Sequence, residues 1–188
     1  NYVISSPYWG NGTDTEVGAV TWVDGTTGIN GVVSSANSLV GSSANDRVGN
    51  RVTALSNGNY LVNSSGWDNG TALNAGAVTW ADGTTGITGI VSSANSLVGS
   101  SANDNVGYRV TVLSNGNYVI SSWGWNNGTA LEAGAVTWAD GLTGISGVVS
   151  SVNSLVGSSA YDHVGRIVTA LSNGHYVVSS AEWTNGTA

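Results

Sequence analysis

The chain has 188 residues, a net charge of −7 and only 8% charged residues, with four arginines and no lysine. The lack of a basic face excludes nucleic-acid binding, and no apolar run approaches the roughly 20 residues of a membrane span, so no membrane insertion is expected. A composition dominated by Gly, Ser, Asn, Thr and Val, without Gln or Cys, predicts an all-β fold with many tight turns and no disulfides.

An internal repeat of 58 residues organises the whole sequence. The step is kept without gaps by Tyr2, Tyr60, Tyr118 and Tyr176, and by Trp22, Trp80 and Trp138. The expected units are residues 1–58, 59–116 and 117–174, with 175–188 beginning a fourth copy, and together they form one β domain. A period of this length predicts stacked units that bury their apolar surfaces on one another. The first residue, Asn1, is not preceded by a signal peptide, which predicts a processed product or a fragment.

Four strands are expected per repeat, taken here in chain order over residues 51–99. Arg51–Leu55 and Asn59–Ser64 are predicted to form a hairpin, because Asn57-Gly58 between them tolerates the positive φ of a type I′ turn. The remaining two strands are expected at residues 76–81 and 89–99, the last one bent near Ala94-Asn95. Small or apolar side chains on both faces of these strands indicate sheets that stack face to face.

Three short motifs recur in each copy and suggest a family. One set of them, in chain order, is Val48-Gly49, Ser64-Ser65-Gly66 and Gly76-Ala77-Val78. With them the chain resembles the FG-GAP repeat of integrin-type β-propellers, which implies blades of four antiparallel strands. The loop that holds calcium in that family corresponds to residues 55–59, which contain no carboxylate, so neither a metal nor another cofactor is expected.

A second resemblance rests on longer stretches, such as NGNYV, GAVTW and ANSLVGS. These stretches are similar to an uncharacterised repeat of large bacterial exoproteins that also carry filamentous-haemagglutinin-like segments. The resemblance implies an extracellular or cell-surface protein, bacterial in origin, with no known enzyme activity.

The expected fold class is therefore all-β, with tandem four-stranded antiparallel blades like those of a β-propeller. Propellers close with four to eight blades, so three blades need another chain to complete a ring, or they stack as an open array. A β-prism or a β-solenoid is the alternative architecture.

The recurring acids are predicted to serve turns rather than catalysis. Asp46, Asp104 and Asp162 are expected to accept backbone N–H bonds, and Asp24, Asp82 and Asp140 to lie in Asp-Gly turns. Acids in identical settings lack the asymmetry of a glycosidase pair, and His163 and His175 each occur in one copy only. No catalytic residue and no metal site is predicted.

Aromatic loops are the strongest candidates for contacts with a ligand or another subunit. The residues are Trp9, Trp67, Trp123, Trp125 and Trp183. Exposed rings beside amides suit stacking on a sugar, and packing between blades is the alternative role. The same loops carry Asn-Gly-Thr sequons, which are either N-glycosylation sites or simple turns. Their asparagines are Asn11, Asn69, Asn127 and Asn185.

The sequence thus predicts a non-enzymatic, extracellular structural or adhesive repeat module. An open array leaves strand edges unpaired, and such edges bind further strands. The expected partner is another copy of the chain, in a homo-oligomer, a filament or a surface fibre. The alternative function is a lectin-like propeller that binds glycans at one aromatic site per repeat.

Overall fold

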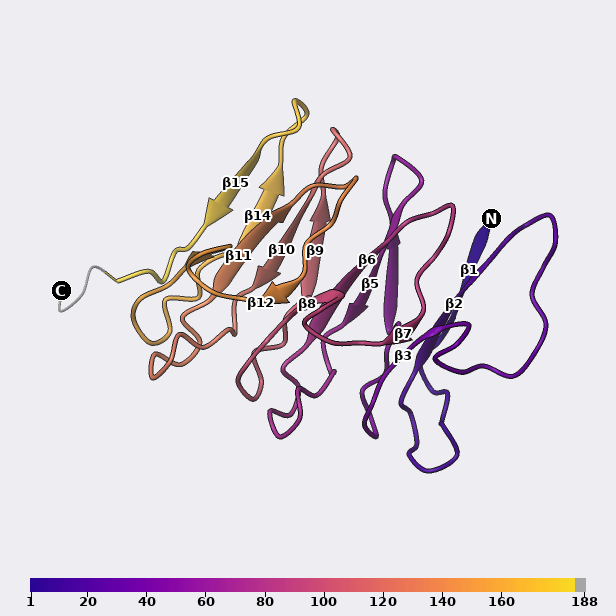
Figure 1. Cartoon of the computed structure of the whole chain (residues 1–188). Coiled ribbons are helices and arrows are strands. Elements are labelled where there is room, and N and C mark those ends of the chain that lie inside the picture. Colours follow the sequence, from indigo (N-terminus) through magenta and orange to yellow (C-terminus); the bar gives the residue numbers. More distant parts are fainter. Residues whose placement is uncertain (185–188) are drawn as a thin grey trace.

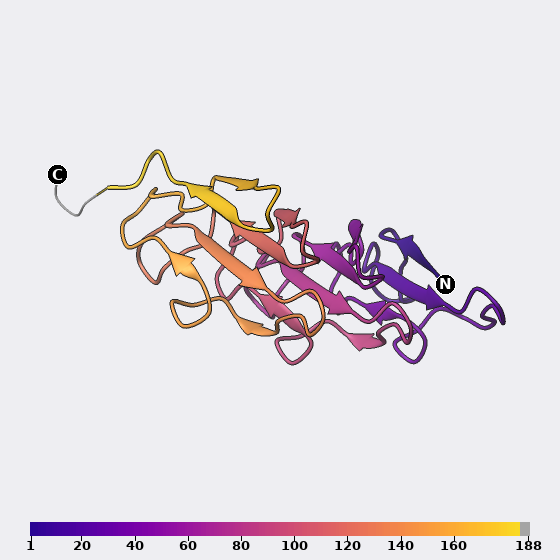
Figure 2. The same ribbon diagram turned by 90° about the horizontal axis from the view of Figure 1, so that it is seen from above.

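A computed structural model describes residues 1–184, and every regular element in that range is a β-strand. Figure 1 shows the strands grouped into sheets that follow one another from the N-terminus to the C-terminus. Seen from above, the sheets form an elongated row in chain order (Figure 2). The all-β fold is therefore confirmed, and within the described residues the sheets form an open array rather than a closed ring.

The fifteen strands belong to four sheets. The strands are β1 (Tyr2–Ser6), β2 (Ala19–Val23), β3 (Leu39–Val40), β4 (Arg51–Ala54), β5 (Tyr60–Ser64), β6 (Ala77–Ala81), β7 (Gly89–Ile90), β8 (Ser96–Val98), β9 (Arg109–Val112), β10 (Tyr118–Ser122), β11 (Ala135–Ala139), β12 (Gly147–Val148), β13 (Leu155–Val156), β14 (Ile167–Ala170) and β15 (Tyr176–Ser179). The sheet orders are β1-β2-β3-β7, β4-β5-β6-β8-β12, β9-β10-β11-β13 and β14-β15. The middle two sheets each contain four antiparallel strands, as the blade prediction requires.

The predicted hairpin between β4 and β5 is present, but its turn is of another type. Among the three loop residues 56–58 only Gly58 has a positive φ, of 91°. The N–H of Gly58 donates to the carbonyl of Leu55 (3.1 Å), and the N–H of Leu55 donates to the carbonyl of Asn59 (2.8 Å). This pattern is a type I turn followed by a left-handed glycine, so the predicted type I′ turn is wrong.

The fourth predicted strand, residues 89–99, is divided between two sheets. It breaks at Ser92–Asn95, where the Oδ1 of Asn95 accepts the N–H of Ser92 (2.9 Å). The side-chain amide of Asn95 also donates to the carbonyl of Ile90 (2.9 Å). After this turn β8 joins its own sheet, whereas β7, before the turn, pairs with the sheet of the preceding repeat.

The second and third repeats therefore each contribute a short parallel strand to the sheet of the preceding repeat. In β3 and β7, Leu39 lies opposite Gly89 and Val40 opposite Ile90. One repeat later, β12 pairs with β8 in the same register. The N–H of Val91 donates to the carbonyl of Val40 at 3.0 Å, so the exchange is hydrogen-bonded and not merely a side-chain contact.

The apolar core lies between successive sheets, as predicted from the small residues on both strand faces. β5 and β10 are buried along their whole length. One cluster joins Leu61, Val78 and Leu97 of the second sheet to Tyr118 and Ile120 of the third. A sheet in the middle of the row is thus covered on both sides by its neighbours, and stacking supplies most of the hydrophobic stabilisation.

Tyr60 and Tyr118 are the large polar side chains of this core. They are 4% and 0% exposed, and neither hydroxyl has a hydrogen-bond partner within the described range. Burial raises the pKa of Tyr60 to about 12 and raises the pKa of Tyr118 as well. The ionised form is thereby disfavoured in the folded chain relative to the unfolded one.

We expect the protein to lose stability in alkali because of these two tyrosines. The contribution of both is complete below pH 10, where the unfolded chain also keeps them neutral, and it falls as the pH rises further; that of Tyr60 disappears between pH 10 and about 12. For Tyr60 the loss amounts to about 2–3 kcal/mol. Urea unfolding at pH 8–12 measures it. Tyr60→Phe with Tyr118→Phe should reduce the loss, whereas Tyr108→Phe, at a ring that is 59% exposed, should not. Equal pH dependence of all three proteins would contradict the assignment.

Candidate functional site

The recurring aspartates hold successive repeats together. The Oδ2 of Asp104 accepts the N–H of Ser100 (2.9 Å) and that of Ser101 (2.8 Å) within its own turn. Its Oδ1 accepts the N–H of Asn126 (3.0 Å) from the following repeat. The bonds to Ser100 and Ser101 confirm the predicted turn cap. Asp104 is also fully buried. The sequence pattern did not reveal its contact to the next repeat.

The first copy of this aspartate has the same arrangement. Asp46 accepts the N–H groups of Ser42 (2.7 Å), Ser43 (2.8 Å) and Asp68 (2.9 Å). Burial raises the pKa of Asp46, and these three backbone donors oppose the rise. Its carboxylate is enclosed by donors and has no open approach, so it is structural.

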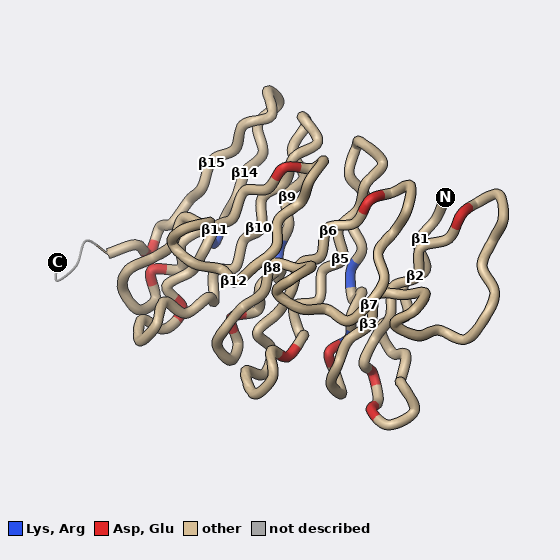
Figure 3. The backbone as a smooth tube through the Cα atoms, viewed as in Figure 1, with Lys and Arg blue, Asp and Glu red and all other residues tan. Residues whose placement is uncertain are grey.

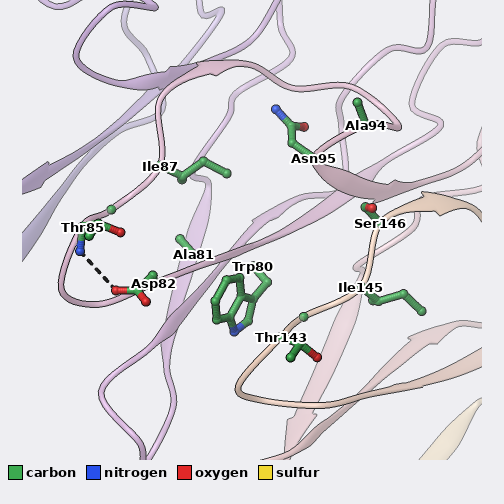
Figure 4. Close-up of a pocket in the computed structure, with 12 residues that line it drawn as sticks. Trp80, Ala81, Asp82, Thr85, Ile87, Ala94, Asn95, Thr143, Ile145 and Ser146 are labelled. Atoms are coloured by element: carbon green, nitrogen blue, oxygen red, sulfur yellow. Dashed lines mark hydrogen bonds between the residues drawn. The ribbon is translucent and has the colours of Figure 1, made fainter.

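The junction of the second and third repeats contains a hollow of about 460 Å³ (Figure 4). Trp80 lies on one side and the loop with Thr143 and Ile145 on the other. The indole N–H of Trp80 donates to the carbonyl of Gly141 (2.9 Å). The ring of Trp80 therefore holds the loop of the third repeat in place by this hydrogen bond. The hollow lies along the boundary, or seam, between the second and third repeats.

Asp82 is the acid at this seam, and it is used by its own turn. Its Oδ1 accepts the N–H of Thr84 (2.6 Å) and that of Thr85 (3.1 Å). Hydrogen bonds from the hydroxyl and N–H of Thr84 lower the pKa of Asp82. The predicted Asp-Gly turn is confirmed. Asp82 is also the one titratable residue lining the hollow, which gives this seam no acid–base pair.

Two of the five candidate tryptophans are buried in the core. Trp67 and Trp125 are each 4% exposed and belong to apolar clusters between sheets. Their ring faces are closed to a ligand and to another subunit, so that prediction is corrected for these two residues. The alternative role, packing between blades, applies to them because burial of a large ring is strongly favourable.

The other three candidate tryptophans are accessible. Trp183 is 53% exposed, and Trp9 and Trp123 are partly exposed. Trp9 and Trp183 occupy the same repeat position as the buried rings, at the two ends of the row. Trp123 has a different position, where the earlier copies carry Ser65 and Pro7.

The sequon asparagines serve loop structure where the chain is described. The side-chain amides of Asn69 and Asn127 donate to the carbonyls of Gly99 and Gly157, both at 2.9 Å. The Oδ1 of Asn11 accepts N–H groups of its own turn. Asn185 lies outside the described residues. Glycosylation of these exposed loops stays a prediction.

His163 is held between two carboxylates rather than in a metal-binding group. Its Nε2 contacts Glu132 (2.8 Å) and its Nδ1 contacts Glu182, which also pairs with Arg166. Burial lowers the pKa of His163, but the hydrogen bonds that its ring donates to Glu132 and Glu182 outweigh this effect, so the pKa is raised. The carboxylates bind opposite sides of the ring, and residues 1–184 contain no cluster of three side chains suited to a metal ion.

An aromatic groove lies beside this charged cluster, and we call it the Trp123 groove. It consists of two adjoining hollows of about 270 and 320 Å³, which share Asn105, Trp123 and Gly124. The rings of Trp123 and Tyr108 meet edge to face, with centroids 5.9 Å apart and planes at 86°. Among the described residues this groove combines accessible rings with free amide groups, as a small-molecule site requires.

The strand exchange is incomplete at both ends of the row. Leu155 of β13 is 60% exposed, whereas its counterparts Leu39 and Leu97 are fully buried in apolar clusters that the following repeat completes. At the other end Val32, the counterpart of Ile90 in β7, is 86% exposed. The described part of the chain thus presents one acceptor edge and one donor segment of the same kind, both unpaired.

The surface carries few charges, and most of them lie in loops. Acidic residues lie mainly in the loops at the ends of the strands, and few charges of either sign lie along the strands (Figure 3). Arg47 pairs with Glu16, and Arg166 pairs with Glu182. No helix within residues 1–184 has the length and hydropathy needed to cross a membrane.

A row of stacked β-sheets, built from near-identical sequence repeats that exchange strands, defines a tandem β-repeat protein. Sequence comparison agrees: the chain matches the family described as "Repeat of unknown function (DUF5650)" over residues 1–50, 54–108, 112–166 and 170–188. The chain therefore belongs to this repeat family, in four tandem copies, and the match is not to an FG-GAP or integrin-like family. No curated protein sequence matches the chain.

Proposed function

We propose that this chain is a non-enzymatic structural module of the bacterial cell exterior that associates end to end with further copies of itself. The observation that carries the proposal is the complementarity of its two unpaired strand positions, β13 and residues 31–33. Unpaired edges bind other strands readily, and head-to-tail contacts that do not close produce fibres. The extracellular location is supported by the resemblance to bacterial exoproteins, and an adhesive role is part of the same proposal.

Contacts inside the chain supply the geometry expected between copies. Because β7 pairs with β3 and β12 with β8 in one register, the 58-residue step places Gly31 of one copy opposite Leu155 of another. Val32 then lies opposite Val156. The N–H of Val33 would donate to the carbonyl of Val156, as that of Val149 donates to Val98 (3.0 Å).

A tryptophan contact supports the same join. Within the chain Trp80 donates to Gly141 and is covered by Gly144, where an added Cβ would lie 2.6 Å from the Cβ of Trp80. The next copy of this ring, Trp138, is 44% exposed. The glycine that corresponds to Gly144 in the first repeat, Gly28, has nothing within 4 Å of an added Cβ. Trp138 and Gly28 of two copies can therefore complete one further seam.

The end-to-end contact between two copies requires one strand to leave its sheet, because β1 and β15 are copies of the same strand. Tyr2 and Tyr176 hold the same repeat position, so a joined sheet has room for either β15 of one copy or β1 of the next. Tyr2 is 52% exposed, whereas Tyr176 packs against the core of the third sheet. We expect β15 to stay in its hairpin with β14 and β1 to be displaced.

The non-enzymatic part of the proposal is supported by the roles of the recurring acids. Asp46 and Asp104 are enclosed by backbone donors, and Asp82 is bound by its own turn. The per-repeat lectin alternative is not retained, because two of its rings, Trp67 and Trp125, are buried.

Cysteine cross-linking tests the join directly, since the chain has no cysteine of its own. Neighbouring strands lie about 4.8 Å apart, within disulfide reach. We expect Val32→Cys combined with Val156→Cys to give a ladder of covalent multimers on oxidation, seen on a non-reducing gel. Light scattering of the unmodified protein should show particles larger than one chain at micromolar concentration.

The matched control combines Val32→Cys with Val152→Cys. Val152 is 94% exposed and lies outside the strand, so this pair should form a ladder far less efficiently. A strictly monomeric particle, or equal ladders from both pairs, would count against the proposal.

A further inference from the structure

We propose that the Trp123 groove is a binding site for neutral carbohydrate. Within residues 1–184 the site occurs once, where the second and third repeats meet, and it does not depend on end-to-end association. The polar and aromatic side chains of its wall are Asn103, Asn105, Tyr108, Trp123, Asn126 and Glu132.

The aromatic rings of the groove are not needed for the fold. Trp123 occupies the position of Ser65, and the turns around both residues close alike: Trp67 N–H to Ser64 at 3.0 Å and Trp125 N–H to Ser122 at 2.9 Å. The counterpart of Tyr108 in the preceding repeat is Asn50. In a chain that otherwise repeats its core residues, both rings are additions to one surface.

The ring geometry leaves aromatic surface open to a ligand. Tyr108 is 59% exposed and Trp123 is partly exposed. Tyr108 meets the Trp123 ring at 86°, and His163 meets it at 71° with centroids 5.5 Å apart. Two perpendicular walls form a corner in which an apolar sugar face can pack on one ring while its edge contacts the other. Exposed rings with a polar handle are well suited to such amphipathic partners.

Amide groups beside the rings can recognise hydroxyls. The side-chain amide of Asn105 donates to the carbonyl of Asn103 (2.6 Å), and the Oδ1 of Asn103 accepts from Asn74 (3.4 Å). Within residues 1–184 the Oδ1 of Asn105 and the Nδ2 of Asn103 have no hydrogen-bond partner. One is an acceptor and the other a donor, which is the pair that a sugar hydroxyl can satisfy.

The charges around the groove favour a neutral ligand. Glu132 contacts His163 (2.8 Å), and Arg166 lies 6.0 Å from the Trp123 ring centroid while it pairs with Glu182. The nearby charges are thus matched, and the chain as a whole is acidic. Phosphate-bearing ligands need unpaired basic groups, so hydroxyl recognition is the chemistry that remains.

A screen of neutral oligosaccharides followed by calorimetric titration tests the site. We expect at least one neutral glycan to bind, and Trp123→Ser to weaken its binding at least tenfold. Tyr108→Asn should weaken it several-fold. Both substitutions install the residue of the preceding repeat, Ser65 or Asn50, so the backbone should accommodate them.

The control is Leu142→Thr, which also installs a residue of the preceding repeat at an exposed position, 68% open, in the turn beyond β11. It should leave glycan binding unchanged, and the thermal unfolding of all three variants should follow that of the parent chain. The proposal is overturned if no neutral glycan binds at millimolar concentration, or if binding survives both Trp123→Ser and Tyr108→Asn. Because binding is scored separately from particle size, its failure leaves the end-to-end proposal standing.

Discussion

Replacing Asp104 with alanine is expected to lower the free energy of unfolding by about 3–5 kcal/mol. The carboxylate is fully buried and accepts the N–H groups of Ser100, Ser101 and Asn126. Its loss leaves three backbone donors without acceptors, removes a further bond from the Asn126 side-chain amide, and weakens the contact between the second and third repeats. Urea unfolding monitored by tryptophan fluorescence measures the change.

Asp140→Ala is the matched control for this substitution. Asp140 also accepts a backbone N–H, that of Leu142 (2.7 Å), but in an exposed turn, where water can replace it. The expected cost is about 1 kcal/mol. Asp104→Asn should fall between the two, because it keeps the volume and one acceptor. If Asp104→Ala lowers the free energy of unfolding no more than Asp140→Ala does, the buried carboxylate does not stabilise the contact between repeats.

Gly76→Ala is expected to destabilise the chain by about 2–5 kcal/mol. Gly76 has a φ of +77°, and an added Cβ would lie 2.3 Å from the nitrogen of Val106 and 2.5 Å from its oxygen. These two residues form a parallel bridge, so the clash is between backbone segments that cannot rotate away. The folded strands would have to separate locally, which thermal or urea unfolding detects.

Gly128→Ala separates the steric cost from the cost of backbone geometry. Gly128 has a φ of +62° with nothing within 4 Å of an added Cβ. We expect it to cost about 1 kcal/mol, the penalty of placing alanine in the left-handed region. Equal effects of the two substitutions would show that the close approach to Val106 is unimportant.

The sequence was sufficient to predict the repeat, its period and most of its strands. The hairpin of Arg51–Ala54 with Tyr60–Ser64 was predicted because β-branched runs flank an Asn-Gly pair. The turn caps at Asp46 and Asp82 were predicted because aspartate oxygens bond backbone donors two to four residues away. These features depend on local chemistry, which a single sequence displays.

Contacts between repeats were not predictable in the same way. Gly89–Ile90 and Ser96–Val98 belong to one continuous stretch of small and apolar residues with Ser and Asn between them, and nothing in that stretch indicates that its first part pairs with Leu39–Val40. The burial of Trp67 and the exposure of Trp123 likewise depend on which residues of a neighbouring repeat cover them. In an identical array each residue has several equivalent candidate partners, and only the spatial offset chooses among them.

The exchange of strands between repeats affects the order in which the sheets fold during synthesis. The sheet that begins at Arg51 receives its last strand only when Val148 has been synthesised. The sheets that begin at Tyr2 and Arg51 are therefore complete only after the following repeat has emerged, and the completed edge then guides the next sheet into register. Such a chain is expected to assemble progressively from its N-terminal side during translation, with the newest sheet always the least ordered.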